Sequence, residues 1–223
     1  MTGSPRPGTV SETKAILAKG DNDLALSRLP KPVVLPLTLA ACMPVTGTQS
    51  EFLTPASDGI YTPGWQILDN GDLSGFLKSN GNGVSFAIGT IPGEGLIAVS
   101  GIIPGSKVGA TPTTGGANFD ATYRVLEVAD VAIDDDGTVN GTSNGETGNI
   151  NLVADFDNAT LVGSSGDLAI NGVILPSSLD GSVEWRGHQG LLDGRIDGSQ
   201  AFGAFHGAND VIVFSGGFVA SAP

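Results

Sequence analysis

Polar and apolar residues alternate along the second half of the chain with the two-residue period of β-strands. In residues 148–156, the apolar side chains at positions 150, 152, 154 and 156 fall on one face, and polar side chains fall on the other. After position 58, no window longer than a few residues shows the 3.6-residue period of an amphipathic helix. The pattern therefore predicts an all-β fold.

Short alternating runs recur at spacings of roughly 8–12 residues and are bounded by Gly, Asn and Asp, which is typical of a β-sandwich or a barrel. Asp157-Asn158 predicts a tight hairpin between residues 148–156 and 159–162. Six further strands are expected at 117–130, 167–175, 179–186, 191–196, 201–206 and 211–219. About eight strands form the smallest barrel whose interior side chains can fill, and closure protects the strand edges. We therefore predict an eight-stranded antiparallel up-and-down β-barrel.

The part upstream of the barrel is less periodic. Residues 59–116 contain apolar runs at 84–91 and 95–103, which predict strands or strand-like coil packed against the barrel. Residues 42–58 are Thr, Ser, Pro and Gly among few large apolar residues, and such a composition predicts a flexible tether. The expected organisation is a leader at 1–41, the tether at 42–58, a less regular N-terminal β extension at 59–116 and the barrel at 117–223.

Cys42 is the only cysteine, and it closes an uncharged run that begins at Pro32. Arg28 and Lys31 precede this run, which is roughly half of the 20 or so apolar residues that a membrane-spanning helix needs. This is the pattern of a secretory signal peptide. Leu39-Ala40-Ala41-Cys42 also resembles the lipobox of bacterial lipoproteins, which predicts acylation of the Cys42 thiol after cleavage. The alternative is a small buried cysteine in a core strand.

The leader itself departs from the usual pattern of a signal peptide. The stretch 1–29 is long for the region that precedes an apolar run, and it contains Glu12, Asp21 and Asp23. Pro32 and Pro36 interrupt a segment that would otherwise prefer a helix. A start codon assigned too far upstream would explain the long leader, and N-terminal sequencing tests this hypothesis.

Charge narrows the range of partners. From Cys42 onward, five Lys and Arg face twenty Asp and Glu, a formal charge of −15. Such a field repels phosphate backbones, so nucleic acid is not expected as a partner. With a single cysteine there is no internal disulfide, and the exported domain must be stabilised by its own core.

The sequence contains few candidates for catalytic or metal-binding residues. His188 and His206 are the only histidines. Because neither has a Cys or Glu at ligand spacing, we interpret both as turn residues in preference to haem or metal ligands. Asp134 and Asp136 belong to an acidic turn that is a weak calcium candidate, because the twelfth position of an EF-hand loop falls on Gly145 and not on a Glu. No Ser-His-Asp set and no acid–base pair stands out. We therefore expect no enzyme and no cofactor.

Trp185 can be interpreted either as a core residue or as an exposed binding residue. It alternates with Glu184 and Arg186, which predicts that the indole faces the barrel interior while its neighbours face water. An exposed tryptophan would instead be a binding anchor, since Trp is enriched at interface hot spots. The usual burial of tryptophan favours the core.

Three segments of the barrel region resemble a known family. Residues 121–123, 150–161 and the Gly-punctuated hairpin at 202–218 are similar to the C-terminal β-barrel domain of transferrin-binding protein B-like surface lipoproteins, over about residues 117–220. The resemblance implies a lipoprotein displayed on a Gram-negative outer membrane, where several members capture host proteins. His206 stands where the family more often has Tyr. The transferrin-binding members have two lobes and this chain has room for one barrel, so transferrin binding itself is not carried over.

These observations predict a lipid-anchored outer-membrane module, held through Cys42, that captures an unidentified protein or small ligand through its barrel loops. Whether it faces the cell surface or the periplasm is left open. An alternative is a carrier of a lipid or haem in the barrel mouth, because Gly and Ala at alternate positions of 201–205 leave room for a cavity. An empty apolar pocket above roughly 300 Å³ favours the carrier, and a filled interior favours protein binding through loops. A third alternative is a structural envelope protein without a ligand.

Overall fold

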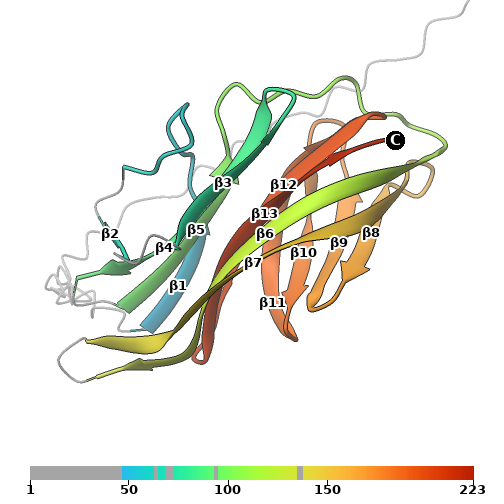
Figure 1. Ribbon diagram of the computed structural model, residues 1–223. Helices are drawn as coiled ribbons and strands as arrows, with labels where there is room; N and C mark the ends of the chain where they lie inside the picture. Colours follow the sequence, from blue (N-terminus) through green and yellow to red (C-terminus); the bar gives the residue numbers. More distant parts are fainter. Residues whose placement is uncertain (1–46, 63–64, 69–72, 93–94, 135–137) are drawn as a thin grey trace, which may run out of the picture. The chain divides into compact units, whose positions relative to one another are not determined.

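The computed structural model describes residues 47–62, 65–68, 73–92, 95–134 and 138–223. Within these ranges the regular elements are thirteen β-strands, arranged as one closed barrel and one open sheet (Figure 1). No helix long and apolar enough to cross a membrane occurs in these ranges. The expectation of an all-β chain is confirmed.

The C-terminal strands form the predicted barrel. Each strand pairs antiparallel with the next along the chain, and the last strand pairs with the first, so that Ile212 lies opposite Ala129 and Ser221 opposite Asp120. The eight strands are β6 (Gly116–Ile133), β7 (Val139–Asp155), β8 (Thr160–Ser165), β9 (Leu168–Ile174), β10 (Leu179–Trp185), β11 (His188–Ile196), β12 (Gln200–Ala208) and β13 (Ile212–Ser221).

Two strands are much longer than the alternation predicted. β6 has 18 residues and β7 has 17, and their hairpin extends past the other strands (Figure 1). The ladder shifts register between Ala129 and Ala132, where Asp130 adopts a positive φ of 53°. Such a bulge bends the strand, which lets one hairpin serve first the barrel and then a region outside it.

The barrel interior is filled with side chains. Alternate residues of its strands form a buried cluster that includes Trp185, Phe119, Phe205, Phe214 and Phe218. Glycines on neighbouring strands make room for these rings: a Cβ atom at Gly203 of β12 would lie 2.6 Å from the ring of Phe218, its partner on β13. The small residues of 201–205 thus accommodate aromatic rings.

The N-terminal part forms a sheet of five strands, ordered β1-β5-β4-β2, with β3 pairing β4 beside β2. Their bounds are β1 (Gly47–Phe52), β2 (Gln66–Ile67), β3 (Ser74–Ser79), β4 (Asn82–Ile91) and β5 (Gly95–Ile102). β1 runs parallel to β5, with Gly47 opposite Gly95 and Phe52 opposite Ser100. The tether predicted at 42–58 is therefore wrong from residue 47 onward, because this polar segment gains backbone hydrogen bonds by pairing with a strand almost fifty residues away.

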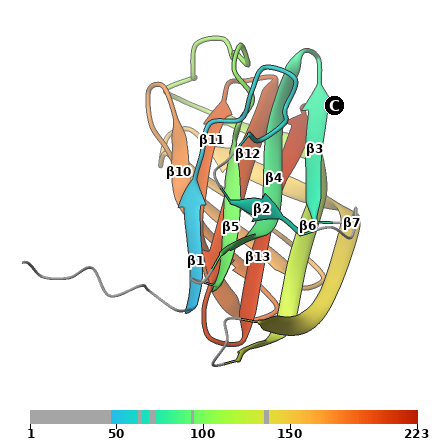
Figure 2. The ribbon, with the colours of Figure 1, turned by 90° about the vertical axis from the view of Figure 1, so that its left-hand side faces the viewer.

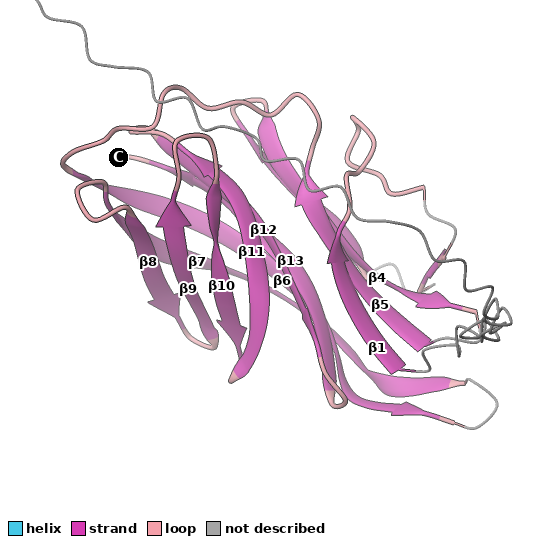
Figure 3. Cartoon of the chain, turned by 180° about the vertical axis from the view of Figure 1, so that it is seen from behind, coloured by secondary structure: helices cyan, strands magenta, loops and turns pink. Residues whose placement is uncertain are grey.

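The sheet packs one face on the barrel (Figures 2 and 3). Val84, Phe86 and Ile88 of β4 join Leu126 of β6 and Phe202 of β12 in a shared apolar cluster, and the Ser215 hydroxyl donates to the Val99 carbonyl at 2.5 Å. The other face is covered by the segment that follows β1. Side chains of this segment and of the sheet form a small apolar cluster there: Leu53, Tyr61, Trp65, Ala87, Ile97 and Val99. The extension at 59–116 is thus more regular than the sequence indicated.

Candidate functional site

The residues nominated from sequence do not come together. Cys42 and Asp136 lie outside the described residues. The exposed Asp134 carboxylate accepts a hydrogen bond from the Asn140 amide at 3.0 Å. Within the described ranges, no three His, Cys, Asp or Glu side chains are grouped as a metal site would require.

The two histidines differ from each other. His188 begins β11 and its Nδ1 lies 2.9 Å from the Asn209 amide nitrogen, beside the turn between β12 and β13. His206 was expected in a turn, but it lies inside β12, because the strand continues through Gly207 to Ala208. Its side chain is 2% exposed and faces the sheet, with the Phe52 ring 4.3 Å away in an edge contact. Neither ring nitrogen has a hydrogen-bond partner among the described residues, and burial lowers the pKa of His206 to about 4.

One end of the barrel is closed by a polar network around Glu127. This carboxylate is 1% exposed and accepts a hydrogen bond from Trp185 Nε1 at 2.5 Å and another from Arg186 Nη1. Arg186 also reaches Asp167 at 3.3 Å and Glu146 at 3.8 Å. Trp185 is 1% exposed, so its expected place in the core is confirmed.

The hollow beside this network bears on the carrier alternative. It measures about 180 Å³, and its lining includes the charged Glu127, Glu146 and Arg186. A lipid or haem site is larger and mainly apolar. The filled interior and the polar rim both favour binding on the outside of the barrel.

At the other end of the barrel, Asp197 holds the loops in place. Its carboxylate accepts hydrogen bonds from the backbone amides of Gly109 at 2.6 Å, Ser199 at 2.7 Å and Gln200 at 2.9 Å. Desolvation raises the pKa of Asp197, but these amides outweigh it and lower the pKa to about 2. The connection between β5 and β6 is thereby fixed to the turn between β11 and β12.

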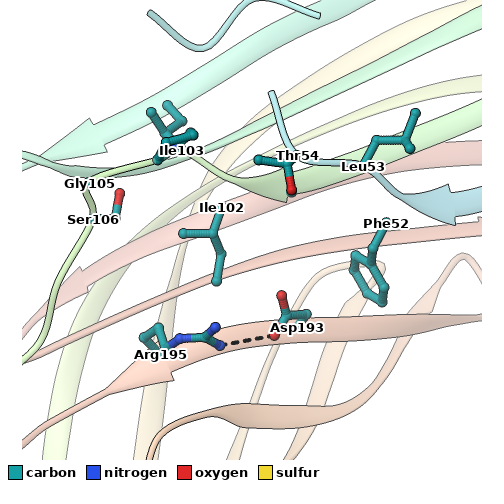
Figure 4. Close-up of a pocket in the computed structure, with 11 residues that line it drawn as sticks. Phe52, Leu53, Thr54, Ile102, Ile103, Gly105, Ser106, Asp193 and Arg195 are labelled. Atoms are coloured by element: carbon teal, nitrogen blue, oxygen red, sulfur yellow. Dashed lines mark hydrogen bonds and ion pairs between the residues drawn. The ribbon is translucent and has the colours of Figure 1, made fainter. Parts of the chain in front are cut away.

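A groove of about 290 Å³ lies between the edge of the sheet and β11 (Figure 4). One wall is the end of β1 with residues 52–54, the floor is the end of β5 with residues 101–106, and the other wall carries Asp193 and Arg195. Arg195 donates to Asp193 at 3.1 Å, and both side chains are about one-third exposed. Among the described strands, β1 is paired along one edge only, and its last residue, Phe52, lines this groove.

Apolar side chains stand at the rim of the groove. Phe52 is 38% exposed and points toward β11 in Figure 4. Leu191 of β11 is 57% exposed and lies directly opposite His206 on β12, against which Phe52 packs. Phe52, at the end of an edge strand, and the Asp193–Arg195 ion pair thus line the groove. Leu191 adds exposed apolar surface on the strand that carries this ion pair, and together they form a surface suited to contact with another molecule.

Sequence reasoning did not find this groove. Arg195 is one of only five basic residues after Cys42, and that rarity is the one signal that singles it out. Phe52 gave no signal because its segment was interpreted as a tether.

The chain is similar in fold to several solved structures. No protein-family model and no curated protein matches it. Transferrin binding protein B of isotype 1 from serogroup B Neisseria meningitidis is 14% identical, with a TM-score of 0.39 over 68% of this chain and 36% of that one. The haemoglobin receptor HpuA from Kingella denitrificans is 15% identical, with a TM-score of 0.38 over 71% of this chain and 57% of that one. Transferrin binding protein B from Haemophilus parasuis Hp5 is 11% identical, with a TM-score of 0.40 over 68% and 37%.

The chain thus spans 36–57% of the length of these structures. Two of them have the name of the family that the sequence resembles. At such identities the likeness concerns the fold alone.

Proposed function

We propose that this chain is a lipid-anchored surface module of the outer membrane that binds a protein ligand on the outside of its barrel, with the groove between β1 and β11 as the contact. The observation that supports this most is the filled interior. Because Trp185 and the phenylalanine rings occupy the barrel, its inward side chains are not available to a ligand. Recognition is then left to the outer face and the loops.

The groove suits a protein ligand in particular. A free strand edge offers backbone donors and acceptors to an extended segment, and half-exposed aromatic and aliphatic side chains beside it act as anchors. Phe52 and Leu191 hold those positions here. The resemblance of the sequence to surface lipoproteins that capture host proteins supports the same kind of partner.

The anchor would orient the groove away from the membrane. Five Cα–Cα steps separate Cys42 from Gly47 at the start of β1, which limits the distance between them to about 18 Å. An acylated Cys42 would therefore keep the beginning of β1 near the lipid surface. The groove lies at the opposite end of β1, around residues 52–54.

Two measurements test this proposal. Mass spectrometry of the native N-terminus should find an acylated Cys42, and a free thiol on an uncleaved chain would remove the anchor. A photo-crosslinking amino acid at position 191 should trap a protein of defined mass on intact cells exposed to host fluid. The same probe at Val162, an exposed apolar position on β8 away from the groove, is the control.

The crosslink should also depend on the groove. We expect Phe52→Asp to weaken it about tenfold or more, because the variant places a charge at an apolar anchor. Equal trapping from positions 191 and 162, or none from 191, contradicts the groove as the contact.

A further inference from the structure

A second pocket, of about 300 Å³, lies at the other edge of the sheet, where β3 meets barrel strand β6. Its walls are mainly apolar and include Ile60, Ile67, Phe76 and Phe86. Phe76 is 53% and Ile60 is 56% exposed, so the mouth of the pocket presents apolar surface to solvent. A pocket of this size is at the lower end of the range that small-molecule sites occupy.

Arg124 of β6 lines this pocket, and among the described residues its side chain has no partner. Arg186 and Arg195 each form ion pairs, whereas the Arg124 side chain makes no hydrogen bond, ion pair or ring contact with the part of the chain that the structure describes. The guanidinium stays charged at any physiological pH. Although Asp and Glu are abundant in this domain, the half-buried Arg124 pairs with no carboxylate among the residues that the structure describes.

Gly75 leaves the guanidinium next to the pocket. A Cβ atom at Gly75 would lie 3.1 Å from Arg124 Nη1 and 2.8 Å from the Phe86 ring. A larger residue there would therefore press on both side chains.

The other polar side chains of the wall are largely committed elsewhere. The Tyr61 hydroxyl donates to the Ser85 carbonyl at 2.9 Å, and the Ser85 hydroxyl donates to the Gly59 carbonyl at 2.5 Å. Burial raises the pKa of Tyr61, so this hydroxyl stays neutral. The exposed Ser74 hydroxyl stands beside Gly75 as a further polar group of the lining. Arg124 is thus the charged donor that the pocket has to offer.

We propose that this pocket binds a small organic carboxylate, with the carboxylate on Arg124 and its apolar part against Phe76 and Ile60. The planar guanidinium matches a carboxylate with two parallel hydrogen bonds, and one cation suits a singly charged group. The site is independent of the proposed protein contact, because it lies at the other edge of the sheet.

Calorimetric titration of the full chain with octanoate at low salt tests this inference. Octanoate should bind saturably, while octanol and octylammonium, which match its chain but not its charge, should bind at least about tenfold more weakly. Arg124→Gln should weaken octanoate binding by about tenfold or more. Lys107→Gln, which removes an exposed cation outside the pocket, should leave it unchanged.

A second variant guards against a folding defect in Arg124→Gln. Phe76→Asp places a carboxylate on an exposed position at the mouth and should also weaken octanoate binding. No saturable binding of octanoate, equal binding of octanol, or unchanged affinity in both variants overturns the inference. None of these results affects crosslinking from position 191, so the two proposals fail separately.

Discussion

Inside the barrel, the buried polar side chains are joined to one another, whereas several on the sheet side are not. Glu127, Trp185 and Arg186 form one connected network at the barrel end. In the described part of the chain, the buried side-chain nitrogens and oxygens without a partner are Trp65 Nε1, Ser100 Oγ and both nitrogens of His206. Ser100 belongs to the sheet, Trp65 to the segment that covers the sheet, and His206 to the barrel strand β12 that faces the sheet.

The difference separates a scaffold from a surface that is open to binding. A fully satisfied network in a low-dielectric interior favours a single packing arrangement, and removing one member exposes the others to the cost of burial without a partner. On the sheet side, a substitution breaks fewer buried hydrogen bonds. This side also borders both the groove at β1 and the pocket at Arg124. We therefore expect mutations to cost stability in the interior and to alter binding at the sheet.

The largest effect is expected from Trp185→Ala. This change empties the centre of a filled interior and leaves Glu127 without its indole donor, so unfolding should become easier by about 4 kcal/mol. Urea denaturation measures it. Phe76→Ala at the exposed sheet edge removes another aromatic ring and should cost about 1 kcal/mol or less; equal losses from the two variants would contradict the comparison.

The second largest effect is expected from acid, which should destabilise the layer between the sheet and the barrel. The unfolded chain takes up a proton on His206 below pH 6.5, whereas the folded chain does so only below about pH 4. The contribution of neutral His206 to the free energy of unfolding is therefore complete above pH 6.5. It is lost as the pH falls toward 4, by about 3 kcal/mol in total. The charged residues on neighbouring strand β11, Asp193 and Arg195, are paired with each other.

Thermal denaturation between pH 7 and pH 4 follows this loss. His206→Phe keeps an aromatic ring against Phe52 and should flatten the profile in that window. Asp197 acts at lower pH: its pKa of about 2 lies below the ordinary 3.8, so its contribution is lost only as the pH falls from about 4 to 2. An unchanged slope between pH 6.5 and 4 in His206→Phe would rule out the histidine.

Arg186 in the polar network and Arg124 in the second pocket allow the same comparison with one residue type. Arg186→Gln removes the cation that neutralises buried Glu127, and we expect a loss of about 2 kcal/mol because Arg186 is itself partly exposed. Arg124→Gln removes no hydrogen bond or ion pair with the described part of the chain and should change the free energy of unfolding by less than about 0.5 kcal/mol. Chemical denaturation of both variants at pH 7 decides this, and similar losses would show that Arg124 has a structural role.

The barrel could be predicted from sequence because its signal is local. Strands such as the C-terminal half of β7 alternate apolar and polar residues, and each barrel strand pairs with the next one along the chain. β12 and β13 do not alternate, because the sheet covers their outer face. The predicted limits of β7 were too short because residues 139–147 are rich in Gly, Thr and Asn and pair only with β6. β1 was missed altogether, since Gly47–Phe52 shows no apolar alternation and becomes a strand through a distant parallel partner.

The candidate sites are less predictable for the same reason. The groove brings Phe52 to Arg195, and the second pocket brings Ile60 and Gly75 to Arg124, across separations that no local pattern encodes. Sequence reasoning favoured a core position for Trp185 from its alternation with charged neighbours. It had no means of showing that the Nε1 of one tryptophan is hydrogen-bonded and that of the other is not.

The smallest expected effect is on that second tryptophan. Trp65→Phe removes a buried N–H that has no partner, so the lost packing is offset and stability should stay within about 0.5 kcal/mol of wild type or rise slightly. Trp185→Phe makes the same change of shape but breaks the bond to Glu127, and it should cost about 2 kcal/mol. Urea denaturation of the two variants isolates the hydrogen bond, because the change in side-chain volume is common to both. Equal costs would mean that packing, and not polar pairing, distinguishes the barrel interior from the sheet.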